Sequence, residues 1–182
     1  PERVLNHLGY GAYNVHPGPP NFPGWAPFSF ALYKNVKNYG VSLHKMSKIV
    51  DSGDIVAVNP FFLDSHFVQA ELENICLSEC LNMIEEWAPQ LVRSPPLNPI
   101  PIQWSGVRTT QKDFKTMCLI DEKISRSEFH RRLKAFGNGD GKYHLHIKLL
   151  DRVYKLDPSK DQNKIKEYIS IHGVRFELQH ER

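Results

Sequence analysis

Three polar residues in the first third of the chain have the types and spacing that acyl transfer requires. Asn14 and His16 lie two residues apart in the run Tyr-Asn-Val-His-Pro-Gly, and Asp51 follows thirty-five residues after His16. Residues two apart in a strand point to the same side of a sheet. The prolines that follow His16 end such a strand, so an amide and an imidazole are expected together at a strand end.

An amide, an imidazole and a carboxylate together suit the transfer of an acyl group to an amine. The amide N–H can stabilise the oxyanion of a tetrahedral intermediate. The imidazole can move a proton near neutral pH, and the carboxylate can orient or charge the imidazole. Taken singly, Asn14 and Asp51 are typical turn residues and His16 is a packed strand end. Their joint pattern favours a catalytic site, provided that the strands flanking Asp51 neighbour the first one.

Four separated motifs resemble, in order and spacing, the core of the 10-formyltetrahydrofolate-dependent formyltransferases. They occupy residues 14–17, 23–27, 39–46 and 50–55. The resemblance covers residues 1 to about 62 and is faint over the last forty-six residues. Many family members carry a Ser-Leu-Leu-Pro run after the histidine, where this chain has Gly-Pro-Pro-Asn. That departure bears on the substrate more than on the chemistry.

The resemblance implies roles for specific residues and a cofactor. Asn14, His16 and Asp51 would be the catalytic residues, and 10-formyltetrahydrofolate would supply the formyl group. No metal is expected, because the leaving group is an activated amide of the cofactor. The segment expected to bind the cofactor comprises Met46, Lys48, Ile49, Val50 and Asp51. The residues expected to contact the substrate are Pro17, Gly18, Phe22 and Trp25. Phe22 and Trp25 could stack on a flat ring, and Trp25 could equally brace the loop.

The fold class that the resemblance implies is α/β, with a Rossmann-like formyltransferase core that lacks its N-terminal half. Family members begin with several β-α units that build one wall of the folate cleft. A fragment is therefore expected, with a parallel sheet that exposes an edge. The expected domains are a catalytic core over 1–93, a Pro-rich linker over 94–112 and a small C-terminal α+β module over 113–182.

Hydrophobic periodicity and turn residues predict the individual elements. A short helix precedes the catalytic strand, and another helix starts at Pro27. A serine and a glutamate spaced as a capping box begin a helix at Ser125, which a glycine-rich turn over 137–141 ends. The predicted strands are 12–16, 40–46, 54–62 and 143–149, with a return at 153–156 and a hairpin within 168–179, and the clearest helix is 68–92.

Composition limits the class of protein. An apolar fraction of 41% is enough for a hydrophobic core and argues against disorder. A net charge of +3 does not by itself indicate a nucleic-acid partner. Three cysteines form no disulfide framework, which favours the cytoplasm. No apolar run approaches membrane-spanning length, so no membrane association is expected.

The acceptor amine is predicted from the size of the C-terminal module. A small helix and β-hairpin module resembles that of the sugar N-formyltransferases, which act on nucleotide-linked amino sugars such as dTDP-amino sugars made for surface polysaccharides. In those enzymes this region often contributes to a homodimer. Alternatives are a methionyl-tRNA formyltransferase, a formyltetrahydrofolate hydrolase, or an inactive fragment that only binds a partner.

Two further pairs of residues have the spacing of a metal or redox site. Cys76 and Cys80 lie one helical turn apart on an apolar stripe, which favours packing over metal or redox chemistry. His144 and His146 share a strand face and could form a metal dyad. Lys142 and Lys148 occupy the same face, which favours an ordinary solvated face.

Overall fold

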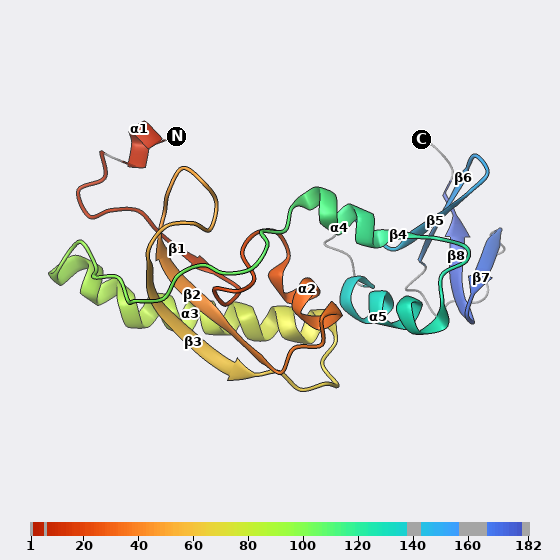
Figure 1. Ribbon diagram of the computed structural model, residues 1–182, viewed down its shortest axis with the longest axis horizontal. Helices are drawn as coiled ribbons and strands as arrows, with labels where there is room; N and C mark the ends of the chain where they lie inside the picture. The colour runs from red at the N-terminus through yellow and green to blue at the C-terminus, as the bar shows by residue number, and fades with distance from the viewer. Residues whose placement is uncertain (1, 6, 138–142, 157–166, 180–182) are drawn as a thin grey trace. The chain divides into compact units, whose positions relative to one another are not determined.

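The computed structural model describes residues 2–5, 7–137, 143–156 and 167–179. The chain divides into two compact units, Pro1–Thr110 and Gln111–Arg182. Figure 1 labels the elements of each unit, beginning with the short helix α1 (Glu2–Leu5). The boundary between the units falls directly before a helix.

The first unit is built on a three-stranded sheet in the order β1-β2-β3. The strands are β1 (Tyr13–His16), β2 (Asn38–Lys45) and β3 (Ile55–Phe62). Both pairings are antiparallel, which corrects the expectation of parallel strands for this part of the chain. The loop over 46–54 between β2 and β3 is shorter than the crossover of a dozen or more residues that parallel neighbours require.

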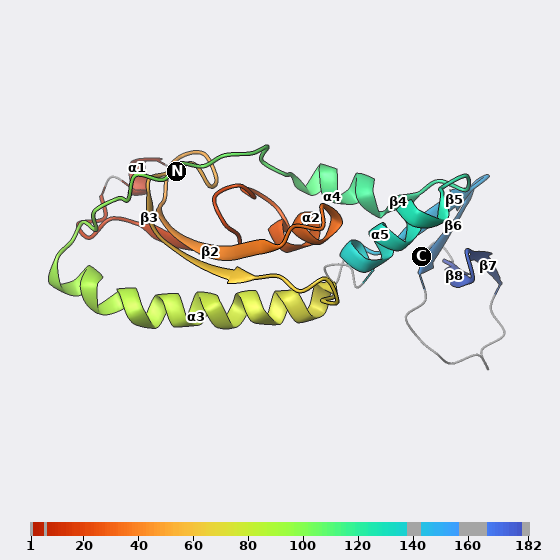
Figure 2. The same ribbon diagram turned by 60° about the horizontal axis from the view of Figure 1, so that its bottom comes forward.

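The two faces of the central strand β2 have different chemistry. Tyr39, Val41 and Leu43 form its apolar face, and the alternate positions carry Ser42 and His44, all buried. The helix α3 (Gln69–Arg93) confirms the prediction over 68–92 and runs along the sheet (Figure 2). Its buried residues Leu72, Cys76 and Met83 belong to the same core. Leu43 and Met83 line one shared hollow, so α3 covers the apolar face and leaves the polar face for the site.

The Pro-rich segment that the sequence predicts as a linker lies in the first unit as far as Thr110. Residues 100–109, here called the strap, are tied to that unit by backbone hydrogen bonds. Ile100 N–H donates to the Ile55 carbonyl at 2.8 Å, and Thr109 N–H donates to the Pro23 carbonyl at 3.0 Å. Proline cannot donate, so the other residues of the strap supply the attachment.

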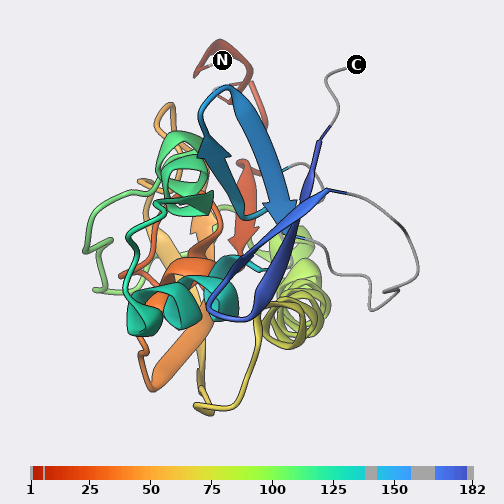
Figure 3. The same ribbon diagram turned by 90° about the vertical axis from the view of Figure 1, so that its right-hand side faces the viewer.

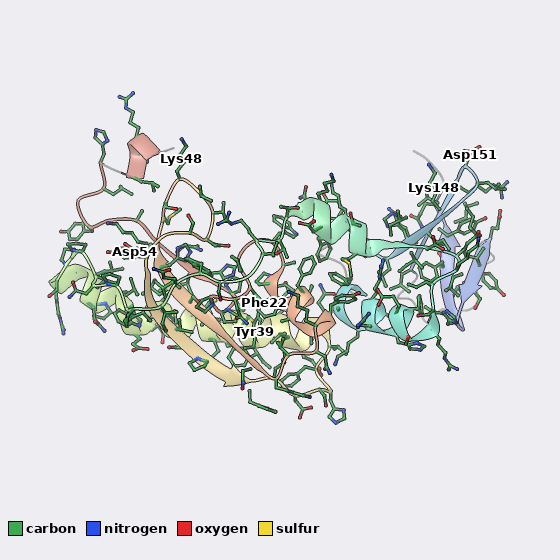
Figure 4. The ribbon with its side chains drawn as sticks, viewed as in Figure 1. Phe22, Tyr39, Lys48, Asp54, Lys148 and Asp151 are labelled. Carbon is green, nitrogen blue, oxygen red and sulfur yellow. The ribbon has the colours of Figure 1, made fainter. Side chains whose placement is uncertain are left out.

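The helix α2 (Pro27–Tyr33) begins at the predicted proline. Proline suits the first turn of a helix because its missing N–H would have no partner there. The aromatic ring of Phe22, in the loop before α2, is buried and lies 5.9 Å from the ring of Tyr39 on β2. This contact holds the loop that follows β1 against the sheet, and Figure 4 shows the two rings together.

The second unit combines two helices with a five-stranded sheet in the order β4-β5-β6-β8-β7 (Figure 3). Its helices are α4 (Gln111–Cys118) and α5 (Arg126–Phe136), and its strands are β4 (Leu119–Ile120), β5 (His146–Leu149), β6 (Arg152–Leu156), β7 (Tyr168–Ile171) and β8 (Val174–Leu178). The core of the unit is aromatic, with fully buried Phe114, Phe129, Phe136 and Phe176.

Most predictions for the second unit are confirmed. Ser125 caps α5 by accepting from the Glu128 N–H at 3.3 Å, and both predicted hairpins are present. Strand β5 starts three residues later than predicted, at His146. The helix α4 was missed, because its two buried residues, Phe114 and Cys118, stand in an otherwise polar segment. Most of the predicted turn over 137–141 lies outside the described residues.

Gly53, in the loop over 46–54, is the position where this unit least tolerates a side chain. A Cβ atom there would lie 1.8 Å from the Lys45 carbonyl oxygen. We expect Gly53→Ala to lower the free energy of unfolding by about 2 kcal/mol or more, measured by urea denaturation. Gly9→Ala, with no heavy atom within 4 Å of its Cβ, is the control. Equal urea midpoints for the two variants would contradict this path of the loop.

Candidate active site

The pairing of β1 with β2 assembles the polar face of the site. Asn14 lies opposite His44, and His16 lies opposite Ser42. Residues opposite each other in an antiparallel pair share a face, so Asn14, His16 and His44 point to the side of the sheet away from α3. Ser42 fixes the next loop, since its hydroxyl donates to the Gly18 carbonyl at 2.8 Å.

The carboxylate of Asp51 bridges two imidazoles on this face. Its Oδ2 lies 3.4 Å from His16 Nδ1, and its Oδ1 lies 3.4 Å from His44 Nε2. The Asn14 amide nitrogen lies 3.2 Å from the same His44 nitrogen. The structure thus brings the three predicted residues together, with His44 between Asn14 and Asp51. Asp51, His16 and His44 are buried, whereas Asn14 is exposed.

Three segments fix the position of Asp51. Its backbone is in the left-handed region, with φ of 47°, a conformation that aspartate tolerates better than most residues. The Gly24 N–H donates to Oδ2 at 2.8 Å. The Arg108 guanidinium, from the strap, donates to the Asp51 main-chain oxygen at 3.3 Å. The carboxylate is therefore held in one orientation before any ligand arrives.

The hydrogen bonds of the two histidines determine where a proton can sit. His16 Nε2 lies 2.9 Å from the Phe22 carbonyl, and His44 Nδ1 lies 2.9 Å from the Lys45 carbonyl. A carbonyl oxygen only accepts, so these two nitrogens carry the protons of the neutral rings. Each neutral ring then faces Asp51 with its unprotonated nitrogen. A histidine can donate to Asp51 only after one ring gains a second proton, so the cluster is arranged to hold one shared proton.

Burial and the neighbouring charge oppose each other in the pKa values. Burial lowers the pKa of His16, and the charge of Asp51 offsets this only in part. Burial raises the pKa of Asp51. The hydrogen bonds from His44 and the Gly24 N–H and the charges of His16 and His44 lower it by more, so the pKa of Asp51 lies below its ordinary value. Asp51 is therefore a carboxylate at neutral pH, and His16 releases its proton readily.

Trp104, from the strap, covers both imidazoles. Its ring is edge-on to His16 and His44, with centroid distances of 5.5 and 5.0 Å. Its indole N–H donates to the Gly53 carbonyl at 2.7 Å, which ties the strap to the loop that carries Asp51. Trp104 and Arg108 were missed because they lie in the predicted linker. His44 was given no role, although its alternation with Ser42 on β2 could have placed it on the same face.

A cleft of about 590 Å³ lies beside the loop over 46–54. Met46 and Lys48, from the predicted cofactor segment, line it, and Figure 4 labels Lys48 on this loop. Ile49 and Val50 do not line it and are exposed. Asp51 lies beside the histidines instead. The volume is within the range of about 300–1,000 Å³ that suits a small-molecule ligand.

The predicted substrate residues separate into buried and accessible ones. Phe22 is 5% exposed and packed on Tyr39, so it is a core residue and not the stacking surface that we expected. Gly18 is also buried, and a Cβ there would lie 2.7 Å from His16 Nε2, so it makes room for the imidazole. Pro17 is half-buried, and its carbonyl accepts from the Tyr39 hydroxyl at 2.9 Å. Trp25 is 42% exposed and remains open to a ligand.

A family model described as formyl transferase matches residues 1–84, which include the whole cluster. Through this segment the chain is similar to the formyl transferase family. The methionyl-tRNA formyltransferase of Syntrophomonas wolfei is 26% identical over 148 residues, 79% of this chain and 46% of that protein. The chain thus spans less than half the length of this relative.

Solved formyltransferase structures share the fold. A sugar N-formyltransferase from a Shewanella species superimposes with a TM-score of 0.71 at 21% identity, covering 83% of this chain and 61% of that one. The N-formyltransferase of Helicobacter canadensis, solved with folinic acid and dTDP-3-aminofucose, has a TM-score of 0.59 at 16% identity, covering 92% of this chain and 65% of that one. At these identities the likeness establishes the fold alone.

The described part of the chain contains neither a membrane-spanning helix nor a metal-binding cluster. None of its helices is long and apolar enough to cross a bilayer. Within the same residues, no group of three or more His, Cys, Asp or Glu side chains could hold a metal ion.

The lowered pKa of His16 predicts a pH-dependent stability. As the pH falls below the ordinary value of 6.5, the unfolded chain binds this proton before the folded one, so the free energy of unfolding falls. Asp51 adds a second loss below its ordinary value of 3.8. We expect urea denaturation to show a smaller loss between about pH 7 and 5 for His16→Gln than for the wild type.

His66→Gln is the matched control for this titration, because the His66 side chain is 94% exposed. Its stability is expected to follow the wild-type curve. The glutamine in His16→Gln retains an N–H for the Phe22 carbonyl, which limits the loss of packing. Parallel curves for His16→Gln and the wild type would contradict the assignment of the lowered pKa to His16.

The contact with Trp104 predicts a change in the titration of His16. In Trp104→Leu the imidazoles lose their aromatic cover, so we expect water to reach them and the pKa of His16 to rise toward 6.5. The measurement is an NMR titration of the His16 ring protons. Trp104→Phe, which keeps a ring edge, should shift it less, and Trp25→Leu should not shift it. An unchanged titration in Trp104→Leu would show that Trp104 does not shield the site.

Proposed function

We propose that this chain carries the catalytic centre that moves a formyl group from 10-formyltetrahydrofolate to the amine of a nucleotide-linked amino sugar. The observation that carries the proposal is the buried Asp51 carboxylate between His16 and His44, with Asn14 at the exposed end of the cluster. This arrangement provides an amide donor next to a group that exchanges a proton near neutral pH.

Each residue of the cluster has a separate role in the proposed reaction. The cofactor, when bound, supplies a formyl carbon attached to its N10 nitrogen. The Asn14 amide N–H stabilises negative charge that develops on the formyl oxygen. His16, in its protonated form, would add positive charge and Asp51 would hold that proton; the cluster would take up the proton that the attacking amine loses and return one to N10 of the departing tetrahydrofolate. The strap excludes water through Trp104, which strengthens these electrostatic interactions.

The cleft beside the loop over 46–54 fits a folate. Met46 provides an exposed apolar side chain, and the polar residues Ser47 and Asp54 line the same cleft. Pterin rings combine a flat apolar body with hydrogen-bonding edges, which suits a wall of this mixed kind. Lys48 lines the same cleft, where its ammonium could attract the carboxylates of the cofactor.

The acceptor is proposed from the second unit. The likeness to the Shewanella sugar N-formyltransferase covers 83% of this chain. The first unit, Pro1–Thr110, is a smaller share of the chain, so the likeness extends into the second unit. The Helicobacter protein was solved with a dTDP-linked amino sugar, which supports a nucleotide-linked acceptor here. The methionyl-tRNA formyltransferase relative favours tRNA as the second candidate.

A mass-spectrometric assay tests the reaction. The complete gene product that contains this chain is incubated with 10-formyltetrahydrofolate and a panel of dTDP- and UDP-amino sugars. We expect one acceptor to become heavier by one formyl group. His16→Ala and Asp51→Ala should each reduce the rate by about a hundredfold or more, and His66→Ala should not change it.

The same assay separates the alternatives. Formylation of methionyl-tRNA and of no sugar would overturn the sugar assignment and keep the catalytic one. Release of formate without any acceptor would indicate a hydrolase. Full activity in both His16→Ala and Asp51→Ala would reject the proposed catalytic centre altogether.

A further inference from the structure

The sheet of the second unit has one apolar and one basic face. Ile147 on β5 and Tyr154 on β6 are buried in the core. The alternate positions carry His146 and Lys148 on β5 and Lys155 on β6, and His146 lies directly opposite Lys155. Because opposite residues share a face, these three side chains lie together on the face that the core does not use.

A cavity of about 410 Å³ opens on this basic face. Besides those three side chains, Lys115 of α4 lines it, together with Tyr143 and His144. The described residues that line the cavity include no acidic side chain. The Lys115 ammonium lies 4.6 Å from the centre of the Tyr143 ring, a cation–π contact that directs Lys115 toward the cavity.

The lysines and histidines line a cavity, whereas the sequence predicts that they form an ordinary solvated face. Like charges gathered in a hollow repel one another more strongly than on an open surface, and Lys155, His144 and His146 are half-buried. Among the described residues, the acidic side chain paired with this face is Glu177 on β8, which lies opposite Lys155. The Glu177 carboxylate also lies 3.6 Å from the Arg175 guanidinium. One carboxylate with an arginine partner does not balance three lysines.

The chemistry of the lining indicates an anion and not a metal ion. His146 Nδ1 donates to the His144 carbonyl at 2.9 Å, so Nε2 of the neutral ring is an acceptor, and the described residues offer no group of three or more metal-ligating side chains here. A metal ion bound there would be repelled by three ammonium groups, whereas a phosphate would be attracted by all of them. Leu119 and Val153 add an apolar wall, and the volume exceeds what a lone phosphate fills.

We propose that this cavity binds the phosphate group of a small molecule, with Lys115, Lys148 and Lys155 on the phosphate oxygens and Leu119 and Val153 against its organic part. The site is separate from the His16 cluster and does not depend on the proposed function. Lys142, which precedes the lining residue Tyr143 in the sequence, lies outside the described residues.

Calorimetric titration of the full chain with sodium pyrophosphate tests the proposal. We expect saturable binding that weakens as salt increases. Lys148→Gln changes an exposed side chain and should weaken binding severalfold, and Lys148→Gln with Lys155→Gln should weaken it by about tenfold or more. Lys112→Gln, on the same helix as Lys115 but outside the cavity, is the matched control and should bind like the wild type.

Titrations with other ligands distinguish a nucleotide from free phosphate as the source of the bound group. Tighter binding of thymidine diphosphate than of pyrophosphate, with both weakened by Lys148→Gln, would indicate a nucleotide in this cavity, and equal binding would indicate free phosphate. His16→Ala should retain binding, which keeps this test independent of catalysis. Absence of pyrophosphate binding, or equal binding by Lys148→Gln and the wild type, would overturn the proposal. So would a single-stranded RNA that binds far more tightly than pyrophosphate and displaces it.

Discussion

The first unit depends on the contact between the Asp51 carboxylate and two imidazoles. A buried carboxylate is stable only if its oxygens are paired, and Asp51 is 4% exposed. The Gly24 N–H donates to Oδ2, and His16 or His44 donates once its ring holds a second proton, so three separate segments meet that requirement. The register of β1 on β2 and the left-handed backbone at Asp51 follow from it, because a small displacement of any segment would leave a buried charge unpaired.

The same constraint explains the two-sided construction of β2. Its apolar side chains pack with α3 and supply hydrophobic stabilisation, so the polar side can hold the charged groups of the site. The strap closes that side through Trp104, whose ring covers the imidazoles while its N–H is bonded to the Gly53 carbonyl. Stability and chemistry are thus assigned to opposite faces of one strand.

The second unit repeats this division without a catalytic cluster. Its aromatic core lies on one face of the five-stranded sheet, and histidine and lysine side chains gather on the other. In both units, side chains alternate along each strand between two faces of the sheet. One face packs in the hydrophobic core, and the other carries the polar side chains of a site.

The sequence by itself determined most of the elements and the three residues that meet at the site. The periodicity of α3, the proline at the start of α2 and the cap at Ser125 are local signals, and two-residue spacing placed Asn14 and His16 on one face. The tertiary structure decided what depends on distant segments. It placed Trp104 of the strap over the histidines, buried Phe22 on Tyr39 and turned Lys115 and Lys148 toward one cavity. Spacing along a chain reports only neighbours within one element, whereas these contacts join segments whose approach is set by packing.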